Sequence, residues 1–91
     1  MKVHVTQETV RGCHTLVQSK SWGEALPIIL RAVHKGGIIK IFSDDSLALI
    51  VDGERFKNTV KIQFYSSLRK AVKAYQMNVE HGVFCPTVEV C

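Results

Sequence analysis

Apolar residues recur with a helical period in two segments of the chain. The first opens with Ser21-Trp22-Gly23-Glu24, which matches a capping box, in which serine and glutamate side chains satisfy free backbone N–H groups of the first turn. The residues at helical spacing are Trp22, Ala25, Leu26, Ile29 and Val33. Gly36-Gly37 follows two basic residues and supplies a stop. We therefore predict a helix between Ser21 and Lys35.

Pro27 leaves two starting points open for this helix. A proline inside a helix lacks the backbone N–H group and its ring clashes with the preceding turn, at a cost of about 3 kcal/mol. The regular helix therefore begins either at the capping box or, if Pro27 is not interior, near Leu26.

The second helical segment has a cleaner apolar stripe, with spacing i, i+3, i+4, i+7 and i+11. Its members are Leu68, Ala71, Val72, Tyr75 and Val79. Ser66 or Ser67 is a suitable N-cap, because a hydroxyl accepts hydrogen bonds from the free amides of the first turn. We expect this helix to start at the two serines and to end at Gly82.

Strand-forming segments occupy the rest of the chain. Residues 38–43, 47–51 and 60–65 are rich in β-branched and aromatic side chains, with turn sequences after the first two, which predicts an antiparallel meander. Residues 83–90 favour another strand, which Pro86 interrupts or places on a sheet edge. Residues 3–6 and 14–18 form either a hairpin or one added strand.

These segments give the order β(β)-α-β-β-β-α-β. We predict an α+β fold, with a single antiparallel sheet of 4–6 strands and two helices packed on one face. A single domain over residues 1–91 is expected, because this length supports one modest core. In a suitable register, the other sheet face carries Lys40, Phe42, Lys61 and Tyr65.

Composition narrows the class of protein. With 46% hydrophobic and 22% charged residues, the sequence is typical of a globular chain. No apolar run approaches the roughly 20 residues of a membrane span, and residues 1–8 lack the apolar core of a secretory signal. The odd cysteine count (Cys13, Cys85 and Cys91) fits a reducing compartment. We expect a cytoplasmic protein with no membrane partner.

Positive charge is concentrated in one part of the sequence. The chain has 12 basic and 8 acidic residues, yet no carboxylate lies between Arg55 and Lys73, and the next one is Glu80. This stretch contains six basic residues: Arg55, Lys57, Lys61, Arg69, Lys70 and Lys73. A positive field of this kind attracts polyanions.

The position of three of these cations suggests a phosphate site. Arg69, Lys70 and Lys73 fall in the first turns of the predicted second helix, where the helix dipole already presents partial positive charge. An external phosphate over that end meets both the cations and the free N–H groups beside Ser66 and Ser67. The alternative is an ordinary solvated helix face, although no acidic residue lies three or four positions away to pair with these cations.

The predicted order α-β-β-β-α over residues 21–79 resembles a double-stranded RNA-binding domain. Residues 68–75, Leu-Arg-Lys-Ala-Val-Lys-Ala-Tyr, are similar to the basic, alanine-spaced start of that family's last helix. The resemblance implies contact with groove phosphates and a preference for RNA over DNA. The chain departs from the family by an acidic tip in the loop of residues 52–59, by the missing proline-histidine loop and by extra strands at both ends.

Other candidate chemistry is weaker. Phe42 and Tyr65 beside Lys40 and Lys61 form an alternative stacking platform for single-stranded bases, without the consensus of the common RNA-recognition fold. The histidines and cysteines lack C-x-x-C or H-x-x-x-H spacing, so neither a metal nor another cofactor is expected. Neither Cys13 nor Cys85 has a recognisable positioned base, because the neighbouring His14 points away from Cys13 in a strand.

The sequence thus predicts a small non-catalytic module that binds the phosphate backbone of nucleic acid, RNA somewhat preferred, with little base specificity. The site residues are Arg55, Lys57, Lys61, Ser66, Ser67, Arg69, Lys70 and Lys73. The alternative is a protein-interaction module, such as a small phage-type regulator or inhibitor that docks on an acidic partner surface. Homodimerisation through an edge strand is compatible with either function.

Overall fold

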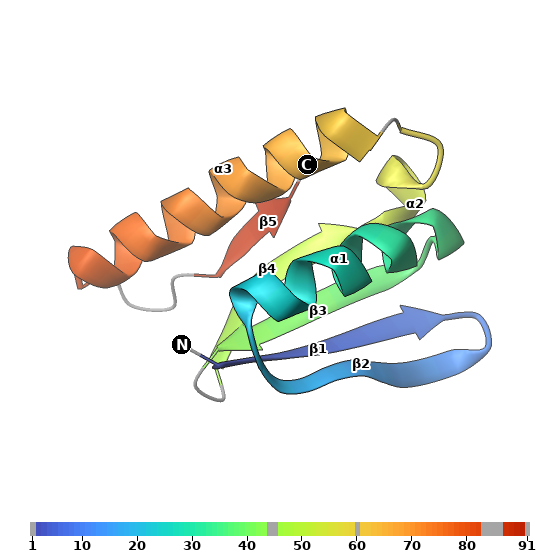
Figure 1. The fold of residues 1–91 in the computed structure, drawn as a ribbon, viewed down its shortest axis with the longest axis horizontal. Helices are drawn as coiled ribbons and strands as arrows, with labels where there is room; N and C mark the ends of the chain where they lie inside the picture. Colours follow the sequence, from blue (N-terminus) through green and yellow to red (C-terminus); the bar gives the residue numbers. More distant parts are fainter. Residues whose placement is uncertain (1, 44–45, 60, 83–86, 91) are drawn as a thin grey trace.

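The computed structural model describes residues 2–43, 46–59, 61–82 and 87–90, and it shows an α+β fold, as predicted (Figure 1). The elements in chain order are β1 (Lys2–Thr9), β2 (Gly12–Ser21), α1 (Trp22–Ala32), the 3-10 turn η1 (Val33–Lys35), β3 (Ile38–Ser43), β4 (Ser46–Asp52), α2 (Gly53–Phe56), α3 (Lys61–Glu80) and β5 (Val88–Val90).

The five strands form one sheet in the order β2-β1-β3-β4-β5. The first three pairings are antiparallel, and β5 lies parallel to β4. The predicted N-terminal hairpin is therefore present, and it joins the main sheet because β1 pairs with β3. Of the predicted strand over residues 83–90, β5 is the described part, and Pro86 lies outside the described residues.

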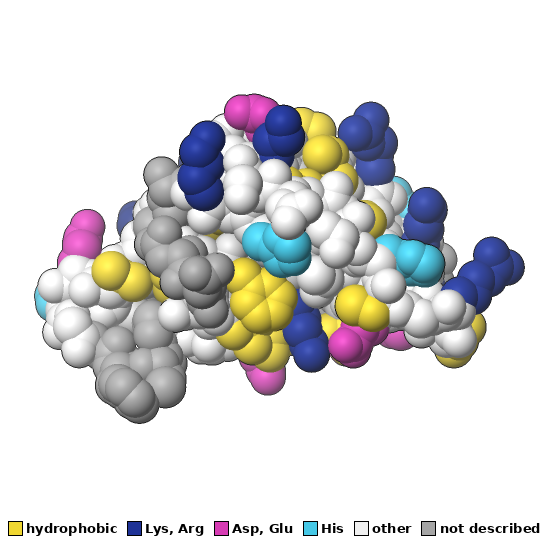
Figure 2. All heavy atoms as spheres, turned by 90° about the horizontal axis from the view of Figure 1, so that it is seen from below, with side chains coloured by type: hydrophobic (Ala, Val, Ile, Leu, Met, Phe, Trp, Pro, Cys, Tyr) yellow, Lys and Arg dark blue, Asp and Glu magenta, His cyan; other side chains and the backbone are white. Residues whose placement is uncertain are grey.

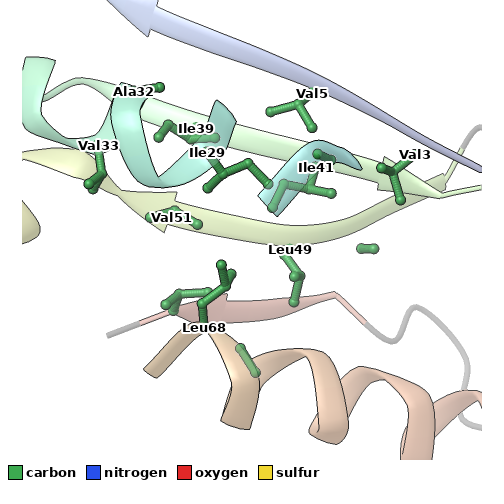
Figure 3. Close-up of a cluster of buried hydrophobic side chains, with 14 of the residues drawn as sticks. Val3, Val5, Ile29, Ala32, Val33, Ile39, Ile41, Leu49, Val51 and Leu68 are labelled. Atoms are coloured by element: carbon green, nitrogen blue, oxygen red, sulfur yellow. The ribbon is translucent and has the colours of Figure 1, made fainter. Parts of the chain in front are cut away.

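The hydrophobic core lies between one face of this sheet and the helices α1 and α3 (Figures 1 and 3). Strand β3 alternates as expected, with Ile39 and Ile41 fully buried under the helices and Lys40 and Phe42 on the opposite, open face. Ile29 of α1 packs into the same core, as does Leu68 of α3. Strand β1 alternates in the same way, burying Val3, Val5 and Gln7, so one face of the sheet is covered by the helices and the other is open.

Helix α1 begins at the capping box despite its proline. Ser21 is the N-cap, and its hydroxyl accepts a hydrogen bond from the backbone N–H of Glu24 at 3.3 Å. Pro27 lies inside the helix on its exposed side, so a start near Leu26 is wrong. The cap and the buried side chains of Ala25 and Ile29 offset the hydrogen bond that Pro27 cannot make.

The predicted third meander strand, residues 60–65, is wrong, because α3 already begins at Lys61. The apolar stripe of this helix extends one turn back from Leu68 to Phe64, which is only 1% exposed and packs on Phe56 with the ring centroids 5.1 Å apart. Burial of this ring outweighs the strand propensity of the β-branched and aromatic residues around it. Gly82 ends the helix as expected, with its N–H group bonded to the carbonyl of Val79 at 3.1 Å.

The shorter meander also removes the layout on which the likeness to double-stranded RNA-binding domains depended. Among the described residues, the elements between the two long helices are η1, the strands β3 and β4, and the short α2. Strand β1 is an interior strand of the sheet, between β2 and β3.

Polar contacts fasten the end of α1 to the sheet at what we term the Gly37 junction: Gln7, Gly36, Gly37, Gly53, Glu54 and Lys57. The buried Gln7 amide donates to the carbonyls of Ala32 and Gly36, both at 2.9 Å. The Gly53 N–H group donates to the Gly37 carbonyl at 2.7 Å. The junction therefore satisfies backbone groups that the end of α1 leaves free.

Candidate nucleic-acid interface

Arg69, Lys70 and Lys73 lie on the solvent side of α3, the long helix that runs along one side of the molecule (Figure 1). With about 3.6 residues per turn, residues three, four, seven and eleven positions apart share a helix face. We define the α3 outer face by its exposed residues: Ile62, Tyr65, Ser66, Arg69, Lys70, Lys73 and Met77. The opposite side buries Phe64, Leu68, Ala71 and Tyr75 in the core.

The cations of the α3 outer face have no carboxylate partner among the described residues. Three ion pairs of the described side chains, Lys20–Glu24, Lys40–Glu8 and Lys57–Glu54, involve none of Arg69, Lys70 and Lys73. Lys73 follows Lys70 by three residues and Arg69 by four, so like charges face each other, at a cost of about 0.2–0.5 kcal/mol per pair. The helix carries this unfavourable charge without an internal counter-ion in the part of the chain that the structure describes.

An aromatic side chain holds one of these cations. The Arg69 guanidinium lies over the Tyr65 ring, 5.8 Å from its centroid, which is within the range of a cation–π contact. The two residues are four positions apart, so the long helix itself creates the contact. The sequence does not predict this contact while residues 60–65 are read as a strand, although the spacing of Phe64 to Leu68 indicates an earlier helix start.

The predicted placement at a helix start is wrong. Arg69 is the ninth residue of the 20-residue α3, and Lys73 is the thirteenth. The helix dipole acts on charges mainly within the first and last turns, so it does not bear on these residues. Ser66 and Ser67 lie in the helix interior and cap no free N–H group, and Ser67 is half-buried.

The other predicted site residues are more scattered. Arg55 is exposed on α2, and Lys61 is the first residue of α3. The Lys57 ammonium lies 2.7 Å from a Glu54 carboxylate oxygen, so this cation is already paired. That hydrogen bond, the bond from the Gly37 N–H and the charge of Lys57 lower the pKa of Glu54. The structure thus brings together Ser66, Arg69, Lys70 and Lys73.

Exposed apolar side chains accompany the cations on α3. Ile62 is 82% exposed, Met77 49% and Tyr65 38%, and Val79 is also exposed beside the outer face. A large apolar side chain in water is unremarkable alone, but a group on one helix marks a surface able to contact a partner. Residue 62 was predicted to lie in a strand, so this feature was not expected.

The predicted stacking platform is divided between two surfaces. Lys40 and Phe42 lie on the open sheet face, as expected, whereas Lys61 and Tyr65 belong to α3. His4 of β1 is the aromatic neighbour of Phe42 instead, with the ring centroids 6.1 Å apart. Figure 2 looks onto the β1–β2 side, where a histidine and a Lys or Arg side chain lie against hydrophobic side chains near the centre.

Within the described ranges, no three His, Cys, Asp or Glu side chains come close enough to hold a metal ion. Cys13 is an exposed free thiol on β2, and Cys85 and Cys91 lie outside the described residues. No helix among the described residues has the length and apolar character to cross a membrane. Comparison with protein-family models, with curated proteins and with solved structures finds no match to this chain.

Proposed function

We propose that the protein binds the phosphate backbone of nucleic acid through the α3 outer face. The observation that carries this proposal is the group Arg69, Lys70 and Lys73, three exposed cations within five residues that have no carboxylate partner among the described residues. Duplex nucleic acid presents a dense row of phosphates, and the release of their counter-ions makes binding to such a cationic surface favourable. Arg69 is positioned by Tyr65, and the Ser66 hydroxyl is an additional donor to phosphate.

The proposed function involves no catalysis and no cofactor. Phosphate contacts fix position without reading sequence, so little base specificity is expected. Arg55, an exposed residue of α2, and Lys61, the first residue of α3, stay in the proposed set of contacts, whereas Lys57 contributes less because it is paired with Glu54. A reducing, cytoplasmic location is part of the proposal, and the odd number of cysteines supports it.

The preference for RNA over DNA stays a prediction. It depends on a three-strand layout between the helices, and the described residues form two strands there. A comparison of RNA and DNA duplexes of equal length tests it directly.

A pair of matched variants tests the proposed interface. We expect the triple variant Arg69→Ala, Lys70→Ala, Lys73→Ala to bind a 20-base-pair duplex at least tenfold more weakly at low salt, because three phosphate contacts are lost. The control is Arg11→Ala, Arg31→Ala, Lys35→Ala, which removes the same charge from exposed residues elsewhere. The proposal fails if the wild-type protein does not bind at low salt, or if both variants lose affinity equally.

The exposed apolar residues of α3 favour a second function, docking on an acidic protein partner. Contact with a phosphate backbone would not bury the exposed apolar side chains of Ile62 and Met77 favourably. A protein surface that combines carboxylates with apolar side chains can contact both the cations and the apolar residues of the α3 outer face. Homodimerisation through an edge strand remains compatible with both functions, because β2 and β5 are the edge strands of the described sheet.

The double variant Ile62→Ser, Met77→Ser separates the two functions. If nucleic acid is the partner, its affinity for duplex changes by less than about twofold, because neither side chain carries charge. If an acidic protein is the partner, binding to a peptide that alternates Glu and Leu weakens in this variant and persists at high salt in the wild type.

A further inference from the structure

The open sheet face contains a second candidate site, independent of α3. Strands β1, β2 and β3 line an open hollow of about 680 Å³, within the size range of small-ligand sites. Its lining includes Lys2, His4, Thr6, Gln18, Lys40 and Phe42. Helix α3 packs against the other side of the sheet, so this hollow does not share residues with the α3 outer face.

Irregular backbone on β2 shapes one wall of the hollow. The β1–β2 register shifts twice, between Val3 and Val5 and between Val5 and Thr6. Ser19 has a φ of 54°, a left-handed conformation that few residues other than glycine adopt. Such bulges bend a strand and redirect its side chains, and here they border the hollow at Gln18 and Ser19.

Two aromatic rings, those of His4 and Phe42, line the hollow. His4 and Phe42 are direct partners in the β1–β3 register, and their rings meet at an interplanar angle of 63°. In this edge-to-face arrangement the pair uses at most one of its four ring faces. The half-buried Phe42 therefore provides a surface on which a flat aromatic ligand can stack.

The charged residues of the hollow favour an anion. Lys2 and Lys40 face a single carboxylate among the described lining residues, that of Glu8. The Lys40 ammonium lies 3.7 Å from the Glu8 carboxylate, and both side chains are substantially exposed. Exposed pairs of this kind contribute little stability, so a phosphate can replace the carboxylate as the partner of Lys40.

A lining that combines two aromatic rings with two lysines fits a ligand that has a flat ring and a phosphate. We propose that the open sheet face binds a nucleotide, with the base stacked on Phe42 and the phosphate held by Lys2 and Lys40. The Gln18 amide and the Thr6 hydroxyl supply donors and acceptors for the edge of the base. The nucleotide is either free or an unpaired nucleotide of a single strand, because a base inside a duplex cannot reach the ring.

Titrations followed by the backbone amide signals of the protein test this site. The probes are thymidine, thymidine monophosphate and a single-stranded thymidine hexanucleotide, added to the α3 triple-alanine variant so that the α3 outer face does not contribute. We expect shifts at His4, Lys40 and Phe42, with tighter binding of the monophosphate than of thymidine. Shifts with the monophosphate identify a site for free nucleotides, and shifts with the hexanucleotide alone identify a single-strand site.

Substitutions then test the stacking itself. We expect Phe42→Ala to weaken hexanucleotide binding about tenfold or more, and Phe42→Tyr to retain it. The control is Ile50→Ala, which removes apolar atoms from the same sheet face opposite Lys40 and outside the lining of the hollow. The proposal is overturned if no probe shifts these amides at millimolar concentration, or if Phe42→Ala binds as tightly as the control. Either result leaves the duplex test of α3 unaffected.

Discussion

The Gly37 junction and the α3 outer face are both rich in polar side chains, but in the part of the chain that the structure describes these side chains are paired within the protein in the junction and largely unpaired on α3. In the junction, the Gln7 amide and the Glu54 carboxylate bind backbone groups of the same chain, and Lys57 binds Glu54. On α3, Lys70 and Lys73 project into solvent with no partner among the described residues. Paired polar groups of the first kind stabilise a fold, and unpaired cations of the second kind are available to a ligand.

The largest predicted effect is on Gly53 of the junction. A Cβ atom at this position would lie 2.7 Å from the carbonyl oxygens of both Gly36 and Gly37, and backbone atoms cannot easily move aside. We expect Gly53→Ala to lower the free energy of unfolding by about 3 kcal/mol, measured by urea denaturation.

Gly23 is the matched control for this substitution. It lies in the first turn of α1, where an added Cβ meets nothing within 4 Å. Gly23→Ala should leave stability unchanged or raise it by up to about 1 kcal/mol, because alanine favours the helix. Equal losses at the two glycines would contradict the close packing assigned to the junction.

The next effect concerns Gln7. Replacement by methionine removes both donors and leaves the carbonyls of Ala32 and Gly36 without these partners. We expect Gln7→Met to cost about 2 kcal/mol in thermal or urea unfolding. Gln18→Met on the exposed side of β2 should change stability by less than about 0.5 kcal/mol. A negligible loss at Gln7 would show that the junction does not depend on its amide.

A smaller effect of the opposite sign is predicted on α3. The triple variant Arg69→Ala, Lys70→Ala, Lys73→Ala removes like charges from one helix face and introduces the best helix former. We expect its free energy of unfolding to rise by up to about 1 kcal/mol while its binding to duplex weakens. A stability loss comparable to that of Gln7→Met would instead assign these cations a structural role.

The smallest effect is the pH dependence of Glu54. Its pKa is lowered in the folded protein by the hydrogen bond to Lys57, then by the Gly37 N–H group and the charge of Lys57. This carboxylate therefore stabilises the fold above the ordinary carboxyl pKa, and the contribution disappears as pH falls through the lowered value. Between pH 7 and pH 3 the wild type should lose slightly more stability than Glu54→Gln. Identical pH profiles would contradict the pairing.

Much of the fold follows from local patterns in the sequence. The Ser21 cap, the Gly36-Gly37 stop and the alternation of residues 38–43 each have a local physical cause, and each is found in the structure. The start of α3 was not predictable in the same way. Alternation in residues 60–65 fits a strand locally. The helix is favoured by the contact between Phe56 and Phe64, which forms only in the tertiary fold.

The candidate site shows the same division. The acid-free stretch identified the cations of α3, but the dipole argument failed because it required the exact start of the helix. The pairing of Lys57, the contact of Tyr65 with Arg69 and the meeting of His4 with Phe42 depend on positions in space. Spacing along the sequence contains only part of that information.

The salt dependence of duplex binding tests the central claim most directly. For wild type, for the α3 triple-alanine variant and for the triple-alanine control at Arg11, Arg31 and Lys35, the logarithm of the association constant is plotted against the logarithm of salt concentration. If Arg69, Lys70 and Lys73 each contact a phosphate, the slope of the α3 variant is smaller in magnitude than that of wild type by about 3, and the control keeps the wild-type slope. An unchanged slope in the α3 variant would contradict the assignment of this helix face to nucleic acid.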